Sequence, residues 1–144
     1  MVRILFLCTG NACRSQMAEG WARRLKRGSI EAFSAGVEKH GLDPRAVKVM
    51  AEVGVDISDH ESKLVEELAD QDFDYVVTLC DKARESCPFF PGETVVVHRG
   101  FDNPPVLAEE ESDETGKLSH YRRVRDQIKA FVETLPDALT ERTS

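Results

Sequence analysis

The sequence has neither the positive charge nor the long apolar runs that several classes of protein require. It holds 19 lysine and arginine residues against 26 aspartate and glutamate residues, and its formal net charge is -7. This balance argues against non-specific binding to nucleic acid or to an anionic membrane surface. No apolar stretch approaches the length of a membrane span, and the run at residues 2–7 is too short for a signal peptide. We therefore expect a cytoplasmic protein that binds neither nucleic acid nor membrane.

Cysteine is also scarce, and the spacing of the four cysteines excludes some uses. Structural disulfides are rare in the cytoplasm, so these thiols are better candidates for catalytic, redox or inert roles. Zinc ligands usually occur in pairs two to four residues apart. Cys80 and Cys87, with six residues between them, do not have that spacing, and Cys8 and Cys13, with four between them, lack a second such pair to complete a zinc site. We expect no metal and no other cofactor.

The apolar and charged fractions, 41% and 31%, are typical of a globular protein, and 144 residues suit one domain with one core. Residues 2–7 are almost continuously apolar, which is typical of a strand buried on both faces of a parallel sheet. Residues 30–35, 74–80 and 93–98 are the other expected strands. We find no internal repeat and no second domain.

Between and after these strands, apolar residues recur at helical spacing. A first helix is predicted from Ser15 to just before Gly28, and a second begins with Asp43 as N-cap and Pro44 as first residue. Residues 62–69 predict a shorter helix and residues 118–135 a terminal amphipathic one. Residues 109–114 predict a solvated acidic loop, and residues 140–144 a frayed end. The pattern predicts a single-domain α/β three-layer sandwich over residues 1–144, with a four-stranded parallel sheet flanked by helices.

The stretch CTGNACRS, residues 8–15, joins the first strand to the first helix. Parallel α/β sheets bind ligands at this end of their strands, where backbone N–H groups and a helix N-terminus favour an anion. The Cys8 thiolate would be favoured by the helix terminus, by Arg14 and by a hydrogen bond from the Ser15 hydroxyl. The alternative is that Cys8 is an inert core residue. The residues expected to hold a tetrahedral oxyanion are Thr9, Gly10, Asn11, Ala12, Cys13 and Arg14.

Several motifs together resemble one family. They are CTGNACRSQMAEGW at residues 8–21, SAG at 34–36, VVTLC at 76–80, GFDNP at 100–104 and RRVRDQI at 122–128. Over nearly its whole length the chain resembles the low-molecular-weight tyrosine phosphatases. Within that family it is similar to the arsenate reductases coupled to thioredoxin.

The resemblance implies a three-cysteine relay. Cys8 attacks arsenate, Cys80 then attacks the Cys8 sulfur as arsenite leaves, and Cys87 moves the disulfide outward. Because a disulfide needs Cα atoms within roughly 7 Å, we expect residues 81–90 to be mobile. Cys13 matches no step of this relay. The alternative is that Cys80 is an ordinary strand residue and Cys87 an incidental loop thiol.

The same resemblance implies a general acid and a set of supporting residues. Asp102 matches the acid, and an asparagine rather than a proline follows it, which favours the reductases over the phosphatases. Asn11 is expected to hold the loop. Some reductases of the family bind potassium beside this loop, and Asn11, Glu19 and Ser34 match three of the ligand positions. Lys63 stands where the fourth ligand, an aspartate, is expected. Its ammonium group can occupy the place of the ion and satisfy Glu19, and the alternative is that Lys63 is a solvated helix residue. We predict that activity does not depend on potassium.

The expected function is therefore reduction of arsenate in arsenic detoxification, by a monomer, with phosphate and sulfate as competing oxyanions. The expected reductant is thioredoxin or a similar dithiol protein, and weak phosphatase activity can remain. One alternative is a low-molecular-weight tyrosine phosphatase. A non-enzymatic oxyanion or redox sensor is a third hypothesis, but the sequence offers no effector segment for it.

Overall fold

Four parallel strands form the centre of the computed structural model, which describes residues 1–90 and 92–143, the last three of these through their backbone alone. The strands are β1 (Val2–Cys8), β2 (Ile30–Gly36), β3 (Tyr75–Thr78) and β4 (Val95–His98), in the order β2-β1-β3-β4. The central strand β1 has neighbours on both sides, and Ile4, Leu5, Phe6 and Leu7 are fully buried. The expected α/β fold and parallel sheet are confirmed.

The register of the strands brings their carboxyl ends to one edge of the sheet. Leu7 lies opposite Ala35 on one side and opposite Thr78 on the other, and Thr78 lies opposite His98. The segments that follow these residues therefore meet at this edge. It is the edge at which a parallel sheet presents its ligand site.

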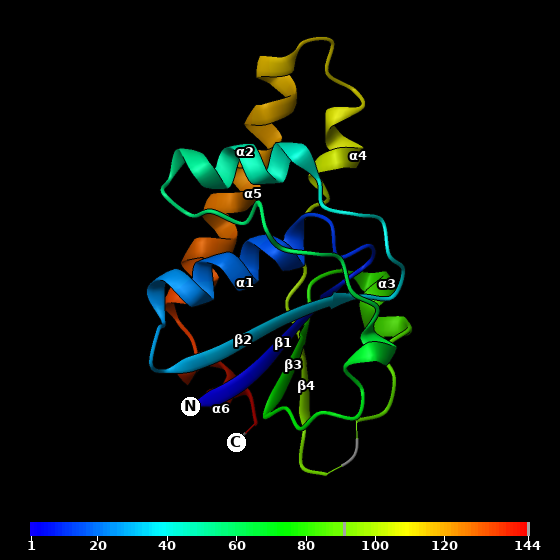
Figure 1. Cartoon of the computed structure of the whole chain (residues 1–144), viewed down its shortest axis with the longest axis vertical. Helices are drawn as coiled ribbons and strands as arrows, with labels where there is room; N and C mark the ends of the chain where they lie inside the picture. Colours follow the sequence, from blue (N-terminus) through cyan, green and yellow to red (C-terminus); the bar gives the residue numbers. More distant parts are fainter. Residues whose placement is uncertain (91, 144) are drawn as a thin grey trace.

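Three long helices pack together beside the sheet (Figure 1). Helix α1 (Arg14–Leu25) packs against β2 and α5 (Glu114–Glu133), and α2 (Pro44–Glu52) packs against α5. The predicted N-cap of α2 is confirmed, because the Asp43 carboxylate accepts a hydrogen bond from the Arg45 N–H at 2.9 Å. Among the described residues, no helix is long and apolar enough to cross a membrane.

The predicted helix at residues 62–69 is wrong. Only the 3-10 turn η1 (Val65–Glu67) forms there. The Lys63 N–H donates to the Asn11 side chain at 2.8 Å, and the Lys63 carbonyl accepts from the Gly36 N–H at 2.8 Å. Because both backbone groups of Lys63 are bonded to other segments, the chain is extended at Leu64 and cannot begin a helix at residue 62.

Three short helices were not predicted: α3 (Asp81–Glu85), α4 (Pro104–Ala108) and α6 (Asp137–Thr143). Segments of five to seven residues are too short to display a helical period. Helix α3 occupies part of the segment expected to be mobile. Residues 140–143, expected to fray, continue α6, and residue 144 lies outside the described residues.

The acidic segment forms a loop as expected, although α5 begins at Glu114 rather than at residue 118. Asp113 caps this helix by accepting a hydrogen bond from the Gly116 N–H at 2.7 Å. The cap explains the early start, because it satisfies one of the free N–H groups in the first turn of a helix that begins four residues before residue 118.

Candidate active site

Residues 8–14, here called the oxyanion loop, have four of their carbonyl groups bonded to the segment that follows β2. N–H groups of residues 37–43 donate to the loop carbonyls: Val37 to Cys8 (3.1 Å), Glu38 to Thr9 (2.7 Å), His40 to Gly10 (3.1 Å) and Asp43 to Ala12 (3.0 Å). A backbone whose carbonyls point outward in this way presents its N–H groups inward. Among the described residues, no acceptor is found for the N–H groups of residues 9–13. The loop is therefore suited to an anion.

The side chain of Asn11 supports the oxyanion loop through hydrogen bonds. It is fully buried and has a φ of 50°, in the left-handed region that asparagine tolerates better than most residues. Its Nδ2 group donates to Ser15 Oγ at 2.7 Å. Its Oδ1 atom accepts from the Lys63 N–H at 2.8 Å and from Gln16 Nε2 at 3.1 Å. Asn11 thus supports the loop as expected, but its side chain does not line the cavity above it.

The Cys8 sulfur, at the end of β1, is 2.9 Å from Ser15 Oγ, and Cys8 is only 2% exposed. Because Asn11 Nδ2 donates to the Ser15 hydroxyl oxygen, the hydroxyl proton is free to point at the sulfur. The Ser15 hydroxyl is thus placed to donate a hydrogen bond to the Cys8 sulfur. The expected hydrogen bond between Ser15 and Cys8 is confirmed.

Arg14 begins α1 and is 6% exposed. One of its amino groups, Nη1, donates to the Phe101 carbonyl at 3.0 Å, which fixes the direction of the guanidinium. Arg14 lines two cavities. One, of about 130 Å³, lies over the oxyanion loop and also includes Cys8. The other, of about 320 Å³, includes Cys80, Phe101 and Asp102.

Cys80 lies beside the loop and Cys87 lies apart from it. The Cys80 sulfur is 3.2 Å from Thr9 Oγ1, and Cys80 is the residue before α3. Cys87 follows the far end of α3 and lines a different cavity, with Phe89 and Phe90 among its neighbours. Partial burial raises the pKa of the Cys87 thiol. The described fold therefore brings Cys80, but not Cys87, next to the oxyanion loop.

Asp102 lies at the rim of the site, with its side chain 65% exposed. Its Oδ2 atom accepts a hydrogen bond from Arg123 Nη1 of α5 at 3.1 Å. The carboxylate is thus held from the side of α5 and borders the same cavity as Arg14 and Cys80.

Cys13, the last residue before α1, is 4% exposed. Burial raises the pKa of the Cys13 thiol well above its ordinary value, and the nearby Asp43 carboxylate adds to the effect. A thiol in this position stays protonated at neutral pH and is a poor nucleophile.

The surroundings of Glu19 differ from the prediction. Its carboxylate accepts a hydrogen bond from Ser34 Oγ at 2.6 Å and is paired with Arg23 Nη2 at 2.9 Å. The Lys63 ammonium group donates instead to the Glu61 carbonyl at 3.2 Å. The expected contact between Lys63 and Glu19 is therefore wrong, because Arg23, one turn along the same helix, reaches the buried carboxylate first. Lys63 supports the loop only through its backbone N–H.

These residues do not fit a potassium ion. The Glu19 carboxylate is already neutralised by a guanidinium, and Asn11 Oδ1 is already bonded to two N–H donors. Within residues 1–90 and 92–143, no group of three or more histidine, cysteine, aspartate or glutamate residues is arranged to hold a metal ion.

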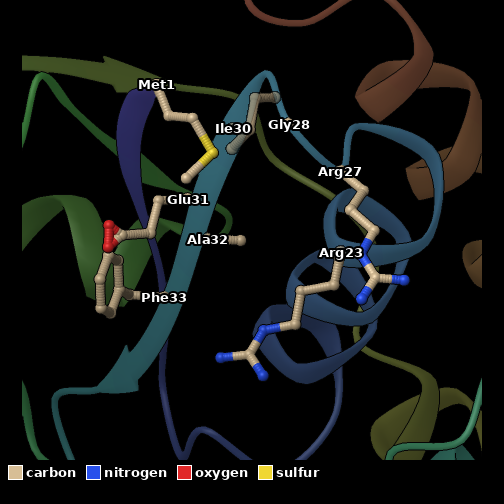
Figure 2. Close-up of a pocket in the computed structure, with 8 residues that line it drawn as sticks. All are labelled: Met1, Arg23, Arg27, Gly28, Ile30, Glu31, Ala32 and Phe33. Carbon is tan, nitrogen blue, oxygen red and sulfur yellow. The ribbon is translucent and has the colours of Figure 1, made fainter.

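A larger hollow of about 600 Å³ lies elsewhere, beside the first half of β2 (Figure 2). Arg23 and Arg27 extend into it from α1 and the turn that follows, and Met1 and Phe33 lie on the other side. It contains no thiol, and Arg23 is committed to Glu19. None of the residues that line this hollow belongs to the oxyanion loop.

The model of the family described as low molecular weight phosphotyrosine protein phosphatase matches residues 3–144. The chain belongs to this family. A relative from Halalkalibacterium halodurans, named arsenate reductase, is 47% identical over 135 residues, which cover 91% of this chain and 95% of the relative. A solved structure of an arsenate reductase in the oxidized state is 33% identical, with a TM-score of 0.78 and coverage of 94% of this chain and 96% of the other. Another, of an arsenate reductase in the phosphate-binding state, is 34% identical with a TM-score of 0.68 and the same coverage.

Membership in the low molecular weight phosphotyrosine protein phosphatase family agrees with the resemblance read from the motifs. Several residues of the site were nevertheless missed by sequence reasoning: Gln16, His40, Phe101, Asn103, Pro105 and Arg123. One signal could have found His40, since it follows the carboxyl end of a predicted strand, where parallel sheets gather their site residues.

Proposed function

We propose that this protein reduces arsenate to arsenite and so detoxifies arsenic. Arsenate is a tetrahedral oxyanion, and the oxyanion loop with Arg14 offers N–H donors on several sides of such an ion. The relative named arsenate reductase and the phosphate-binding state of another arsenate reductase support this substrate class. Phosphate and sulfate are the expected competitors.

The observation that carries the proposal is the second thiol at the loop. Cys80 Sγ is 3.2 Å from Thr9 Oγ1, and Thr9 is the neighbour of Cys8 in the chain. A phosphatase needs a single nucleophile, whereas a two-electron reduction needs a second thiol to complete a disulfide. Cys80 supplies it.

In the first step the Cys8 thiolate attacks arsenic and forms a sulfur–arsenic bond. One arsenate oxygen departs as water after accepting protons, and Asp102, at the rim of the cavity, donates one of them. The loop N–H groups and Arg14 stabilise the negative charge on the remaining oxygens. Arsenic is still pentavalent at this stage.

In the second step the Cys80 thiolate attacks the Cys8 sulfur. The sulfur–arsenic bond breaks, its electron pair stays on arsenic, and arsenite leaves while a Cys8–Cys80 disulfide forms. Cys87 then attacks Cys80 by thiol–disulfide exchange, which frees Cys8 and leaves a Cys80–Cys87 disulfide. One arsenate and two thiols have become one arsenite, one disulfide and one water.

A dithiol protein such as thioredoxin then reduces the Cys80–Cys87 disulfide. No bound cofactor is needed, because the thiols carry both electrons. One chain contains the loop, the acid and all three thiols, so we propose that it acts as a monomer. It works in the cytoplasm, where thiols are kept reduced.

The test is a single turnover. Fully reduced protein is mixed with arsenate without a recycling partner, arsenite is quantified, and the disulfides are mapped by mass spectrometry. We expect one arsenite per chain and a Cys80–Cys87 disulfide. Four intact thiols and no arsenite would contradict the proposal.

The second candidate, a tyrosine phosphatase, is favoured by the family match and by the loop with Asp102. Cys80→Ser separates the two, because it should abolish arsenite formation and leave hydrolysis of a phosphate ester unchanged. A sensor, the third candidate, would be oxidised once and would not turn over with excess dithiol. Cys8→Ser is the common control, since it removes the nucleophile that both reactions require.

A further inference from the structure

Helix α3 depends on tertiary contacts to stay folded. Ala83 is buried, and the other four residues of the helix are exposed. An isolated helix of this length is not stable in water, because too few hydrogen bonds form to offset the cost of nucleation. The contacts that hold α3 therefore determine where Cys80, the residue before the helix, is placed.

Two side-chain contacts hold the first turn of α3, one toward each edge of the sheet. The Lys82 ammonium group contacts the Glu38 carboxylate in the segment that follows β2, which passes beside α3 (Figure 1). On the other side, Asp81 Oδ1 lies 3.5 Å from Nε2 of His98, the last residue of β4. Strands β2 and β4 are the outer strands of the sheet, so the start of α3 is held from both directions.

The contact between Lys82 and Glu38 also connects α3 to the oxyanion loop. The Glu38 N–H group donates to the Thr9 carbonyl at 2.7 Å, so the backbone that carries this carboxylate is fixed to the loop. Thr9 Oγ1 is in turn 3.2 Å from the Cys80 sulfur. The start of α3 is thus joined to the loop at two points, directly through Cys80 and through the ion pair of Lys82 with Glu38.

The ion pair is charged at neutral pH. The hydrogen bond from Lys82, and then that from His40, lowers the pKa of Glu38, which therefore remains a carboxylate. The side chains of Lys82 and Glu38 are 54% and 41% exposed. An exposed ion pair contributes little to the stability of a fold, so it can break and form again in every catalytic cycle.

We propose that the ion pair of Glu38 with Lys82 is a latch, which holds Cys80 beside the oxyanion loop in the reduced protein and opens when Cys80 pairs with Cys87. A disulfide needs Cα atoms within roughly 7 Å. A folded α3, which lies between the two thiols, spans about 7.5 Å by itself, so the helix deforms and Lys82 moves away from Glu38. The ion pair then stabilises the reduced form alone and opposes the disulfide. Glu38 and Lys82 are positioning residues, because they act on Cys80 through the placement of α3.

This inference rests on the proposed function for the pairing of Cys80 with Cys87, but it is tested without arsenate. Cys8→Ser protein is equilibrated with mixtures of glutathione and glutathione disulfide, and the Cys80–Cys87 disulfide is quantified by mass spectrometry. Two protein thiols and one glutathione disulfide give one protein disulfide and two molecules of glutathione. Adding Lys82→Met should raise this equilibrium constant about two- to fivefold, the range that exposed ion pairs provide.

Further variants in the same background separate the latch from a general effect on the helix. Glu38→Gln should raise the constant by a similar factor, and combining it with Lys82→Met should raise it no further, since both changes remove one contact. Lys82→Arg keeps the charge and should stay near the starting value. Glu85→Gln, which changes an exposed carboxylate at the other end of α3, is the matched control. High salt should reduce the difference that Lys82→Met makes.

An unchanged equilibrium constant in Lys82→Met and Glu38→Gln would overturn the inference. Additive increases would overturn it too, since the two residues would then act independently. The same holds if no Cys80–Cys87 disulfide forms at any ratio of glutathione disulfide to glutathione. If the single-turnover experiment yields no arsenite while these variants favour the disulfide as expected, the proposed function fails and the latch stands.

Discussion

Asn11 is the residue on which the shape of the oxyanion loop depends most. It adopts a positive φ and makes hydrogen bonds to Ser15, Gln16 and the N–H group of Lys63, all from a fully buried position. Asn11→Ala leaves the Lys63 N–H and the Gln16 amide without this acceptor. We expect it to lower the free energy of unfolding by about 1–3 kcal/mol, the usual cost of an unsatisfied buried polar group.

Urea denaturation measures that loss, and the rate of Cys8 alkylation measures the effect on the nucleophile. Ser15→Ala is the matched control, because it removes the group next to the sulfur and keeps the bonds of Asn11 to Gln16 and Lys63. It should slow alkylation with a smaller loss of stability. Unchanged alkylation in both variants would show that the hydroxyl does not favour the thiolate.

The ion pair between Glu19 and Arg23 leads to a prediction about potassium, again at the scale of single residues. Since Arg23 is paired with the buried carboxylate, arsenate reduction should proceed equally in sodium and potassium buffers. Arg23→Met should destabilise the protein, because it leaves Glu19 buried without its cation. Lys63→Met should have little effect, since the ammonium group contacts only a backbone carbonyl. A strong potassium stimulation of the wild type would contradict this account.

At the scale of elements, helix α3 separates the two thiols that must finally pair. Cys80 precedes the helix and Cys87 lies beyond its other end. A rise of about 1.5 Å per residue gives α3 a length of about 7.5 Å, so a Cys80–Cys87 disulfide needs the helix to deform. We expect amide exchange over residues 81–85 to become faster when the protein is oxidised by arsenate.

Hydrogen exchange followed by mass spectrometry measures this change. Cys87→Ser is the control, because its oxidation stops at the Cys8–Cys80 disulfide and should not unwind the helix in the same way. Equal protection of α3 in reduced and oxidised wild type would mean that the thiols meet without a change in the helix.

For the whole molecule, ion pairs between α2 and α5 hold two of the long helices together. Glu52 accepts from Arg122 at 2.7 Å and from Arg125 at 3.1 Å, and Glu114 accepts from Arg45 at 3.0 Å. Hydrogen bonds from Arg122 lower the pKa of Glu52, and those from Arg45 lower the pKa of Glu114, in both cases from an ordinary value of 4.5. These carboxylates are therefore easier to ionise in the folded protein than in the unfolded chain.

A lowered pKa in the folded state contributes stability above the ordinary pKa, and that contribution is lost as the pH falls through the folded value. The melting temperature should therefore drop below about pH 4.5. Glu52→Gln should reduce the melting temperature at pH 7 and make the drop in acid smaller. Glu110→Gln, an exposed carboxylate in the acidic loop, is the control. Parallel pH profiles for wild type and Glu52→Gln would contradict the prediction.

Much of the fold could be read from local patterns. The run at residues 2–7, apolar except for Arg3, is typical of a strand covered on both faces, and it therefore predicted a central strand of a parallel sheet. The helix start at Asp43 and Pro44 depends on neighbours in the chain, and it is confirmed. The helix predicted at residues 62–69 failed because Lys63 is bonded through its backbone to two distant segments, which no local pattern records.

In the candidate site, as in the fold, some features follow from the local sequence and others depend on the tertiary structure. The sequence by itself determined the strand–loop–helix order that puts Cys8 beside Ser15 and Arg14, since these contacts span only a few residues along the chain. Only the tertiary structure decided that Arg23 rather than Lys63 faces Glu19, that Asp102 is held by Arg123, and that His40 covers Gly10. The positions of Asp102 and His40 depend on how segments far apart in the chain pack. The partner of Glu19 depends on which of two cations, Arg23 or Lys63, the folded backbone brings within reach of its buried carboxylate.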